Sequence, residues 1–256
     1  LSNVEYIDCR SNLCIAISQN KLYIWGSVSD AQRITHLHYP TPTEIVSNKF
    51  TKVFKISMKF YDYVILTDAG LFSSKVDGNI HHFIKIDFPY TDHIIDIKCS
   101  NYNIYVLTKD GDRFDLHACD YVGNNYYLFD YVTLRNPKIY TRSDKCIILF
   151  ELINGTTEIL KMNDYGNNYI TFTKIVCDRE IINDVQHIVV DRGGYNQPHT
   201  FYICKSDSVY CFGENYRYEL GLGHSDVIIN PVKHPFLSDK NLGTLPVQKN
   251  IKKASG

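Results

Sequence analysis

Apolar and polar residues alternate in short runs along the chain, with a period of two residues rather than the longer period of a helix. Such runs predict β-strands, because successive side chains of a strand point to opposite faces of the sheet. One run recurs at a regular interval, and its central apolar residues are Tyr23, Leu71, Phe114, Ile159 and Tyr210. These residues lie 48, 43, 45 and 51 positions apart, which predicts five repeats of roughly 47 residues.

Each recurring run is predicted to be the second strand of a hairpin. Another apolar run precedes it across a short turn, such as Asp68-Ala69-Gly70, Asp110-Gly111 or Asn154-Gly155. Asp-Gly and Asn-Gly favour hairpins because both central residues of the preferred turn need a positive φ. A further strand is predicted before each hairpin, at 4–9, 52–57, 94–99, 138–143 and 185–190. A fourth is predicted after a longer loop, at 42–46, 83–87, 127–132, 170–175 and 230–235.

Four strands in each of five repeats, with almost no helical periodicity, are typical of a β-propeller in which each repeat forms one radial blade. We therefore expect an all-β fold in a single domain spanning 1–256. The expected repeats are approximately 4–49, 50–92, 93–135, 136–180 and 181–245, and 246–256 has the pattern of another first strand. Because that strand has no predicted partners, we expect that the native ring has six or seven blades. The alternative is that the ring closes by an arrangement that the sequence does not reveal.

The fifth repeat carries a specific motif. It reads V-Y-C-F-G-E-N-Y-R-Y-E-L-G-L-G at 209–223 and is followed by Pro231-Val232. This stretch closely resembles the repeat of the regulator of chromosome condensation family, and I-K-K-A-S-G at 251–256 resembles the strand that follows in that family. The first repeat keeps L-Y-I-W-G-S and Pro42, whereas the other three keep only the spacing of apolar residues. The resemblance implies a propeller of the seven-bladed type.

The glycines of this motif have a structural explanation. Gly213 allows the backbone to pass close to a neighbouring strand, and Gly221 and Gly223 permit a turn that a β-branched residue would not accept. A phosphate-binding loop would instead lead into a helix with a suitably placed lysine, and none follows. The chain departs from the family at Tyr218-Glu219, where the family has Gly-Gln, so the geometry of this turn is open.

Composition narrows the possible functions. The 27 basic and 28 acidic residues give a formal charge of −1, which disfavours binding to nucleic acid or to an acidic membrane. We find neither an apolar run long enough to span a membrane nor the order of a signal peptide. We therefore expect an intracellular protein, cytoplasmic or nuclear, or inside a host cell if the source is a virus or an intracellular microbe. Abundant Ile, Asn, Lys and Tyr resemble the proteins of AT-rich genomes.

Cysteines and histidines do not form a predicted metal site. The eight cysteines lie in apolar runs without a Cys-x-x-Cys pair, and we interpret them as small buried residues in a reducing compartment. The pairs His36/His38 and His81/His82 are expected in inter-strand loops, without partners at zinc spacing. A further set of possible zinc ligands also lacks the spacing of a zinc finger. This set consists of Cys204, Cys211, His224 and His234.

No Gly-x-Ser-x-Gly, His-Glu-x-x-His, Walker or dinucleotide motif occurs, so no catalytic residue and no cofactor is predicted. Asp110-Gly111-Asp112 lacks the remaining ligands of a calcium loop and is predicted to be a hairpin turn. Asn154-Gly155-Thr156 is formally a glycosylation acceptor, and we favour a turn there as well.

Two surface segments of the fifth repeat are candidate partner-binding sites. One is the insertion at 191–199, because long loops on a rigid scaffold often carry binding residues. A tolerated insertion without function is the alternative. The other segment follows Gly213. The candidate residues are Arg192, Tyr195, Asn196 and His199 in the first segment, and Glu214, Tyr216 and Arg217 in the second.

These observations favour a non-enzymatic propeller or scaffold that binds another protein, such as a subunit of a large assembly. The family resemblance implies an alternative, because its founding member is a guanine-nucleotide exchange factor for a nuclear small GTPase and also binds chromatin. No motif places exchange residues on this chain, and its charge disfavours chromatin. Other members are light sensors, ligase modules, scaffolds or enzyme inhibitors, and the single Trp25 excludes light sensing through clustered tryptophans.

Overall fold

Twenty strands in five sheets make up the described part of the fold. The computed structural model describes residues 1–10, 12–29, 36–58, 62–77, 80–100, 103–120, 126–129, 135–142, 145–151, 157–164, 170–192 and 199–237. Each sheet contains four antiparallel strands that are consecutive in the chain, and each predicted strand overlaps one of them. The chain is therefore an all-β propeller with four-stranded blades, as its repeat pattern predicts.

The first three blades contain β1 to β12. Blade one has β1 (Val4–Arg10), β2 (Leu13–Ser18), β3 (Lys21–Ser29) and β4 (His36–Ile45). Blade two has β5 (Val53–Met58), β6 (Tyr63–Thr67), β7 (Gly70–Asp77) and β8 (Ile80–Lys85). After the short helix η1 (Thr91–His93), blade three has β9 (Ile94–Cys99), β10 (Asn103–Asp110), β11 (Arg113–Asp120) and β12 (Tyr126–Phe129).

The last two blades contain β13 to β20. Blade four has β13 (Arg135–Arg142), β14 (Lys145–Glu151), β15 (Thr157–Asp164) and β16 (Ile170–Ile175). A single helical turn, α1 (Arg179–Ile182), leads into blade five. That blade has β17 (Val185–Arg192), β18 (His199–Lys205), β19 (Val209–Gly213) and β20 (Ile228–Lys233).

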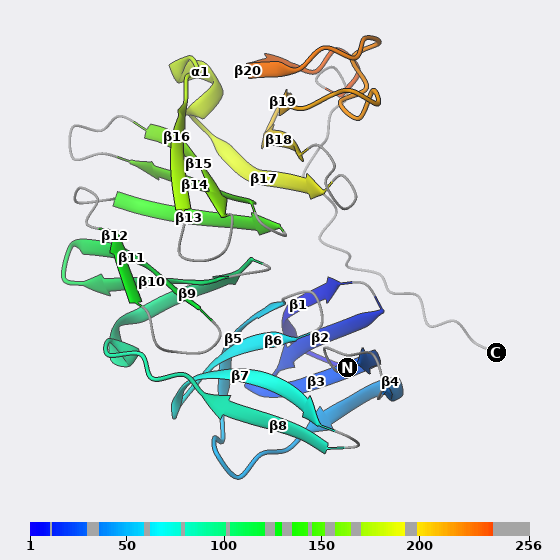
Figure 1. Cartoon of the computed structure of the whole chain (residues 1–256), viewed down its shortest axis with the longest axis vertical. Coiled ribbons are helices and arrows are strands. Elements are labelled where there is room, and N and C mark those ends of the chain that lie inside the picture. The colour runs from blue at the N-terminus through cyan, green and yellow to red at the C-terminus, as the bar shows by residue number, and fades with distance from the viewer. Residues whose placement is uncertain are drawn as a thin grey trace.

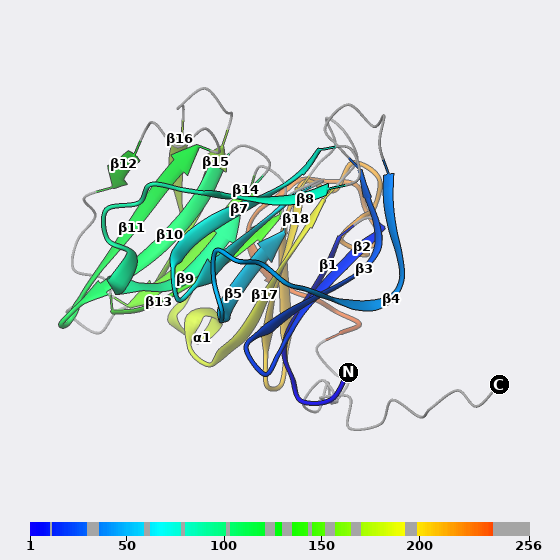
Figure 2. The same ribbon diagram turned by 90° about the horizontal axis from the view of Figure 1, so that it is seen from below.

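The blades follow one another around an arc in chain order, with their fourth strands at the outside (Figure 1). Neighbouring blades meet through their first strands, since β1 contacts β5, β5 contacts β9, β9 contacts β13 and β13 contacts β17. In the side view, β9 to β16 lie together on the left of the molecule, and β1 to β4 lie on its right (Figure 2). Among the described residues no comparable contact joins β17 to β1. Residues 246–256 lie outside the described residues, and the further repeat expected there stays a prediction.

The hydrophobic core lies between neighbouring blades, because the middle strands bury both of their faces. In β6, Ile65 packs in the cluster shared by blades one and two, whereas Val64 and Leu66 pack in the cluster shared by blades two and three. Successive side chains of a strand point in opposite directions, so a sheet that is covered on both faces needs a continuous apolar run. This arrangement explains the run Y-V-I-L in β6.

Two pairs of histidines lie in strands rather than in the loops predicted for them. His36 and His38 belong to β4, and His81 and His82 belong to β8. These fourth strands start earlier than predicted, at His36 and Ile80, because polar residues at or next to their starts interrupt the apolar pattern. A strand at the outer edge of a sheet needs no continuous apolar run, so its polar start resembles a loop in the sequence.

The hairpin turn predicted in the third blade is confirmed. The strand β10 ends at Asp110, β11 begins at Arg113, and Gly111 between them has φ 58°. The turn predicted at 154–156 lies outside the described residues.

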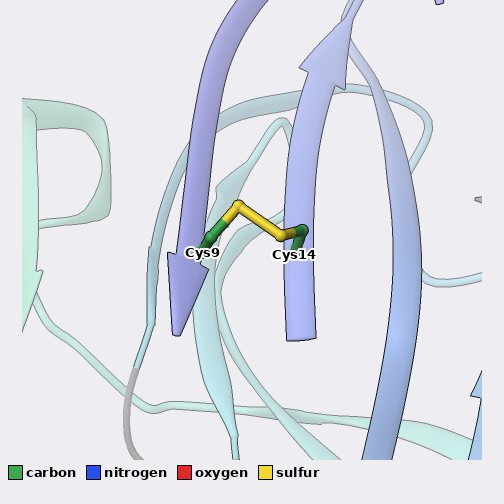
Figure 3. Close-up of a disulfide and its surroundings, with 2 residues drawn as sticks. All are labelled: Cys9 and Cys14. Atoms are coloured by element: carbon green, nitrogen blue, oxygen red, sulfur yellow. A yellow bond between two sulfur atoms is a disulfide. The ribbon is translucent and has the colours of Figure 1, made fainter. Parts of the chain in front are cut away.

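Cys9 and Cys14 form a disulfide between β1 and β2 (Figure 3). The two residues are directly opposite in the register of these strands, with Cα atoms 4.1 Å apart. The prediction that the cysteines act as small buried residues is therefore wrong for this pair. Because disulfides are typical of oxidising compartments, the cysteines no longer favour a reducing one. Cys99, Cys119 and Cys211 are buried thiols as predicted, and burial raises the pKa of Cys211 to about 11.

Candidate functional site

Residues 214–227 join β19 to β20 in blade five, and we name this segment the rim loop. Three predicted candidate residues lie in it, Glu214, Tyr216 and Arg217, and all three are exposed. The loop contains no helix or strand. Its shape therefore depends on turns and on side chains that pair with its backbone.

A buried asparagine determines the path of the rim loop. Asn215 is fully buried, and its side chain donates from Nδ2 to His224 O at 2.6 Å and accepts at Oδ1 from Leu220 N at 2.8 Å. Two turns follow one another, because Tyr218 N donates to Asn215 O and Gly221 N donates to Tyr218 O, both at 3.0 Å. Buried polar groups cost free energy when unpaired, so these bonds select one conformation of the loop.

Two side chains of blade five attach the rim loop to the sheet. The hydroxyl of Tyr202 in β18 donates to Glu219 O at 2.9 Å. The ring of His234 contacts Leu220 O through Nε2 at 3.0 Å, and its Nδ1 accepts from the backbone N–H groups of 236–237. Because Nδ1 accepts these bonds, the ring proton is assigned to Nε2, which donates to Leu220 O. The loop is thus a preorganised platform rather than a free segment.

Tyr218 has a left-handed backbone conformation, with φ 63°. This residue stands where the family motif has glycine, and the chain makes the turn with tyrosine in that conformation. A residue with a Cβ costs about 1 to 2 kcal/mol there, because the Cβ crowds the following carbonyl oxygen. The tyrosine is 59% exposed, so burial of its ring offsets little of this cost.

Tyr218→Gly is therefore expected to raise the free energy of unfolding by up to about 1 kcal/mol, since relief of the strain exceeds the added entropy of the unfolded chain. Equilibrium unfolding in urea measures the change. Tyr216→Gly is the matched control, because it removes a similarly exposed ring from a residue that is not among those with positive φ. That control is expected to lower stability through the added entropy of the unfolded chain. A gain of equal size in both variants would contradict the assignment of strain to Tyr218.

The other predicted segment is only partly described. Arg192 is the last residue of β17 and His199 is the first residue of β18. Tyr195 and Asn196 lie outside the described residues.

The two candidate segments leave the same end of the fifth sheet. Arg192 is paired with His199 across β17 and β18. The next residue, Thr200, is paired with Gly213 at the end of β19, where the rim loop begins. Which strand ends lie together depends on strand register, and the register places the end of β17 and the start of β18 beside the start of the rim loop.

Large exposed apolar side chains concentrate in and beside the rim loop. Of the sixteen such side chains among the described residues, six lie within 216–236. They are Tyr216, Tyr218, Val227, Ile229, Val232 and Phe236. Single exposed apolar residues are normal, whereas a contiguous group of them is typical of a contact surface. Sequence analysis predicts only Tyr216 of this group, although apolar residues at both alternating positions of the outer strand β20 could have indicated Ile229 and Val232.

A second group of polar side chains lies where the first strands meet. In β9, the Lys98 Nζ atom is 3.7 Å from an Asp96 carboxylate oxygen and 5.7 Å from the ring centre of Tyr6 in β1. Burial raises the pKa of Tyr6, although the charge of Lys98 opposes this effect. Burial and Lys98 together lower the pKa of His187 in β17. Since Asp96 balances the charge of Lys98, we interpret this group as a contact between blades.

Within the described ranges, no three His, Cys, Asp or Glu side chains gather in a way that could hold a metal ion. No helix in the same part of the chain has the length and the apolar composition needed to cross a membrane.

No protein-family model matches the chain, and no curated protein sequence matches it either. Membership of the regulator of chromosome condensation family therefore stays a prediction. Solved structures do match. Human WBSCR16 is similar over 90% of this chain and 67% of its own, with a TM-score of 0.58 and 12% identity. At that identity the likeness concerns the fold alone.

Two further structures are similar at lower scores. The β-propeller domain of Myceliophteria thermophila Cps50 (Swd1) matches 91% of this chain and 74% of its own, with a TM-score of 0.45 and 9% identity. The putative TolB of Agrobacterium tumefaciens matches 82% of this chain and 76% of its own, with a TM-score of 0.49 and 9% identity.

Proposed function

We propose that this propeller is a non-enzymatic scaffold that binds another protein through the outer end of blade five. The observation that carries the proposal is the concentration of exposed apolar side chains within 216–236. Tyrosine is a common anchor of protein interfaces, since it offers a large contact area and loses little conformational freedom on binding. A subunit of a large assembly is the kind of partner that this surface suits.

The hydrogen bonds of Asn215 and His234 support the proposal, because they hold Tyr216 and Tyr218 in one arrangement before a partner arrives. A preorganised surface loses less entropy on association than a flexible loop of the same composition. Rigid elements that present variable loops are also the usual way in which propellers carry binding residues.

Photo-crosslinking tests the proposed surface. A photoreactive phenylalanine analogue at position 216 is expected to crosslink a discrete protein from a eukaryotic lysate, identified by mass spectrometry. The same analogue at Tyr90, which is 49% exposed and lies before η1, is expected to give no such product. Tyr216→Ala is expected to weaken capture of that protein by about tenfold, which is typical of an interface anchor. Equal crosslinking from both positions would overturn the proposal.

The same capture separates the scaffold from the exchange factor that the family resemblance implies. It is run once with magnesium and once with a chelator. A small GTPase that is enriched only after its nucleotide and magnesium are removed would replace the scaffold proposal with nucleotide exchange. A partner that binds equally under both conditions supports the scaffold.

A further inference from the structure

The rim loop is more acidic than the chain as a whole. Between β19 and β20 it contains Glu214, Glu219 and Asp226 against one basic residue, Arg217, which gives a formal charge of −2, compared with −1 for all 256 residues. The side chain of Asp226 is 85% exposed, and Glu214 is exposed as well. The segment that carries the exposed aromatic rings therefore has a net negative charge, which favours a cationic partner.

Aromatic faces and carboxylates attract the same kind of group. The face of a tyrosine ring attracts a cation, and arginine also stacks on the ring through its planar guanidinium. Tyr216 and Tyr218 are 64% and 59% exposed, so their rings are accessible to such a group. Glu219 Oε2 accepts from Arg217 N at 2.8 Å, and its Oε1 is buried. The carboxylates that a bound cation would meet are therefore those of Glu214 and Asp226.

The conformation of Tyr218 is the second, independent observation. This residue retains a left-handed conformation at a cost in stability, and burial of its largely exposed ring offsets little of that cost. Strained residues that persist at an exposed position are characteristic of functional sites. A glycine would form this turn without strain, so the ring, rather than the turn, accounts for tyrosine at position 218.

Building on the proposed function, we propose that the rim loop binds a basic segment of the partner protein, in which an arginine packs on Tyr216 and Tyr218 and faces the carboxylates of the loop. Charge complementarity selects this partner over an acidic or purely apolar one. Tyr218 then acts as a specificity residue that the chain retains although it lowers stability.

A labelled Gly-Ser peptide that contains several arginines is the probe, and the same peptide with citrulline in place of arginine is its control. Citrulline keeps the size and planarity of arginine and lacks the charge. Fluorescence polarisation at low salt is expected to show binding of the arginine peptide and at least about tenfold weaker binding of the citrulline peptide. Equal binding of the two peptides would overturn the proposal.

Variants of the whole chain locate the binding. Tyr218→Gly is expected to weaken binding by about threefold, and its combination with Tyr216→Ala by about tenfold, whereas Tyr90→Ala leaves binding unchanged. Because Tyr218→Gly is expected to be more stable than the natural chain, misfolding cannot explain its loss of binding. Full binding by the double variant would overturn the proposal.

The outcomes for the two proposals are distinguishable. Crosslinking of a partner from position 216, together with failure of the arginine peptide, would leave the interaction surface in place and remove the basic partner. Peptide binding without any crosslinked protein would remove the proposed function and leave only a cation preference of the loop.

Discussion

Replacing Gly26 by alanine is expected to lower the free energy of unfolding by about 3 kcal/mol or more, because two separate penalties act at this position. The residue has φ 98°, which side chains rarely adopt. An added Cβ would also lie 2.0 Å from Asn12 O and 3.2 Å from Leu13 Cα. That carbonyl cannot easily move away, since it accepts from Ser27 N at 2.8 Å. Urea unfolding of the purified variant measures the loss.

Gly111→Ala separates the two penalties. Gly111 also has a positive φ, of 58°, but an added Cβ there would meet no atom within 4 Å. This variant is expected to lose only about 1 kcal/mol, the cost of the left-handed conformation alone. Similar losses in the two variants would show that the backbone around Gly26 relaxes and that the close approach is not a constraint on the fold.

The fold was predictable because its main signals are local in sequence. Alternation with a period of two marks each strand, and the turn at Gly111 marks a hairpin, so neither depends on knowing the rest of the chain. The outer strands β4 and β8 were only partly predicted. Polar residues at or next to their starts, His36 in β4 and His81 in β8, are compatible with an outer edge, and no pattern of apolar residues distinguishes such an edge from a loop.

The disulfide and the candidate site required strand register. Arg10 pairs with Leu13 across β1 and β2, so Cys9 and Cys14 must be opposite each other. A search for Cys-x-x-Cys misses this pair, although a tight turn between two strands could have indicated it. Register likewise brings Arg192, His199 and the start of the rim loop to one end of the sheet. The left-handed conformation of Tyr218 had no signal except its departure from a glycine in the family motif.

Tyr218, which stands where the family motif has glycine, shows why a residue of the rim loop can serve binding although it lowers stability. In the middle strands of the blade, Phe201 and Phe212 are placed where burial stabilises the fold, in stacked contact with ring centroids 4.8 Å apart. Tyr216 and Tyr218 contribute little burial, so selection for folding alone does not account for them. A substitution that improves stability and weakens binding is the outcome that distinguishes a binding residue from a structural one.

Asn215→Ala is expected to lower the free energy of unfolding by about 2 to 3 kcal/mol, because it leaves two backbone groups without their side-chain partners. The Leu220 N–H is the more costly of the two, since Leu220 is fully buried and water does not replace the lost acceptor. The His224 carbonyl loses its donor as well. Urea unfolding measures the loss, and hydrogen exchange is expected to become faster at the Leu220 amide.

Asn230→Ala is the matched control, because Asn230 is an exposed asparagine in the adjoining strand β20 and its replacement is expected to change stability by no more than about 0.5 kcal/mol. Equal losses in the two variants would contradict the role of Asn215 in shaping the rim loop. Asn215→Ala also leaves Tyr216 and Tyr218 in the chain. Weaker binding of the arginine peptide by this variant, measured where it is still folded, would therefore come from loss of loop order, which is the contribution expected of a preorganised surface.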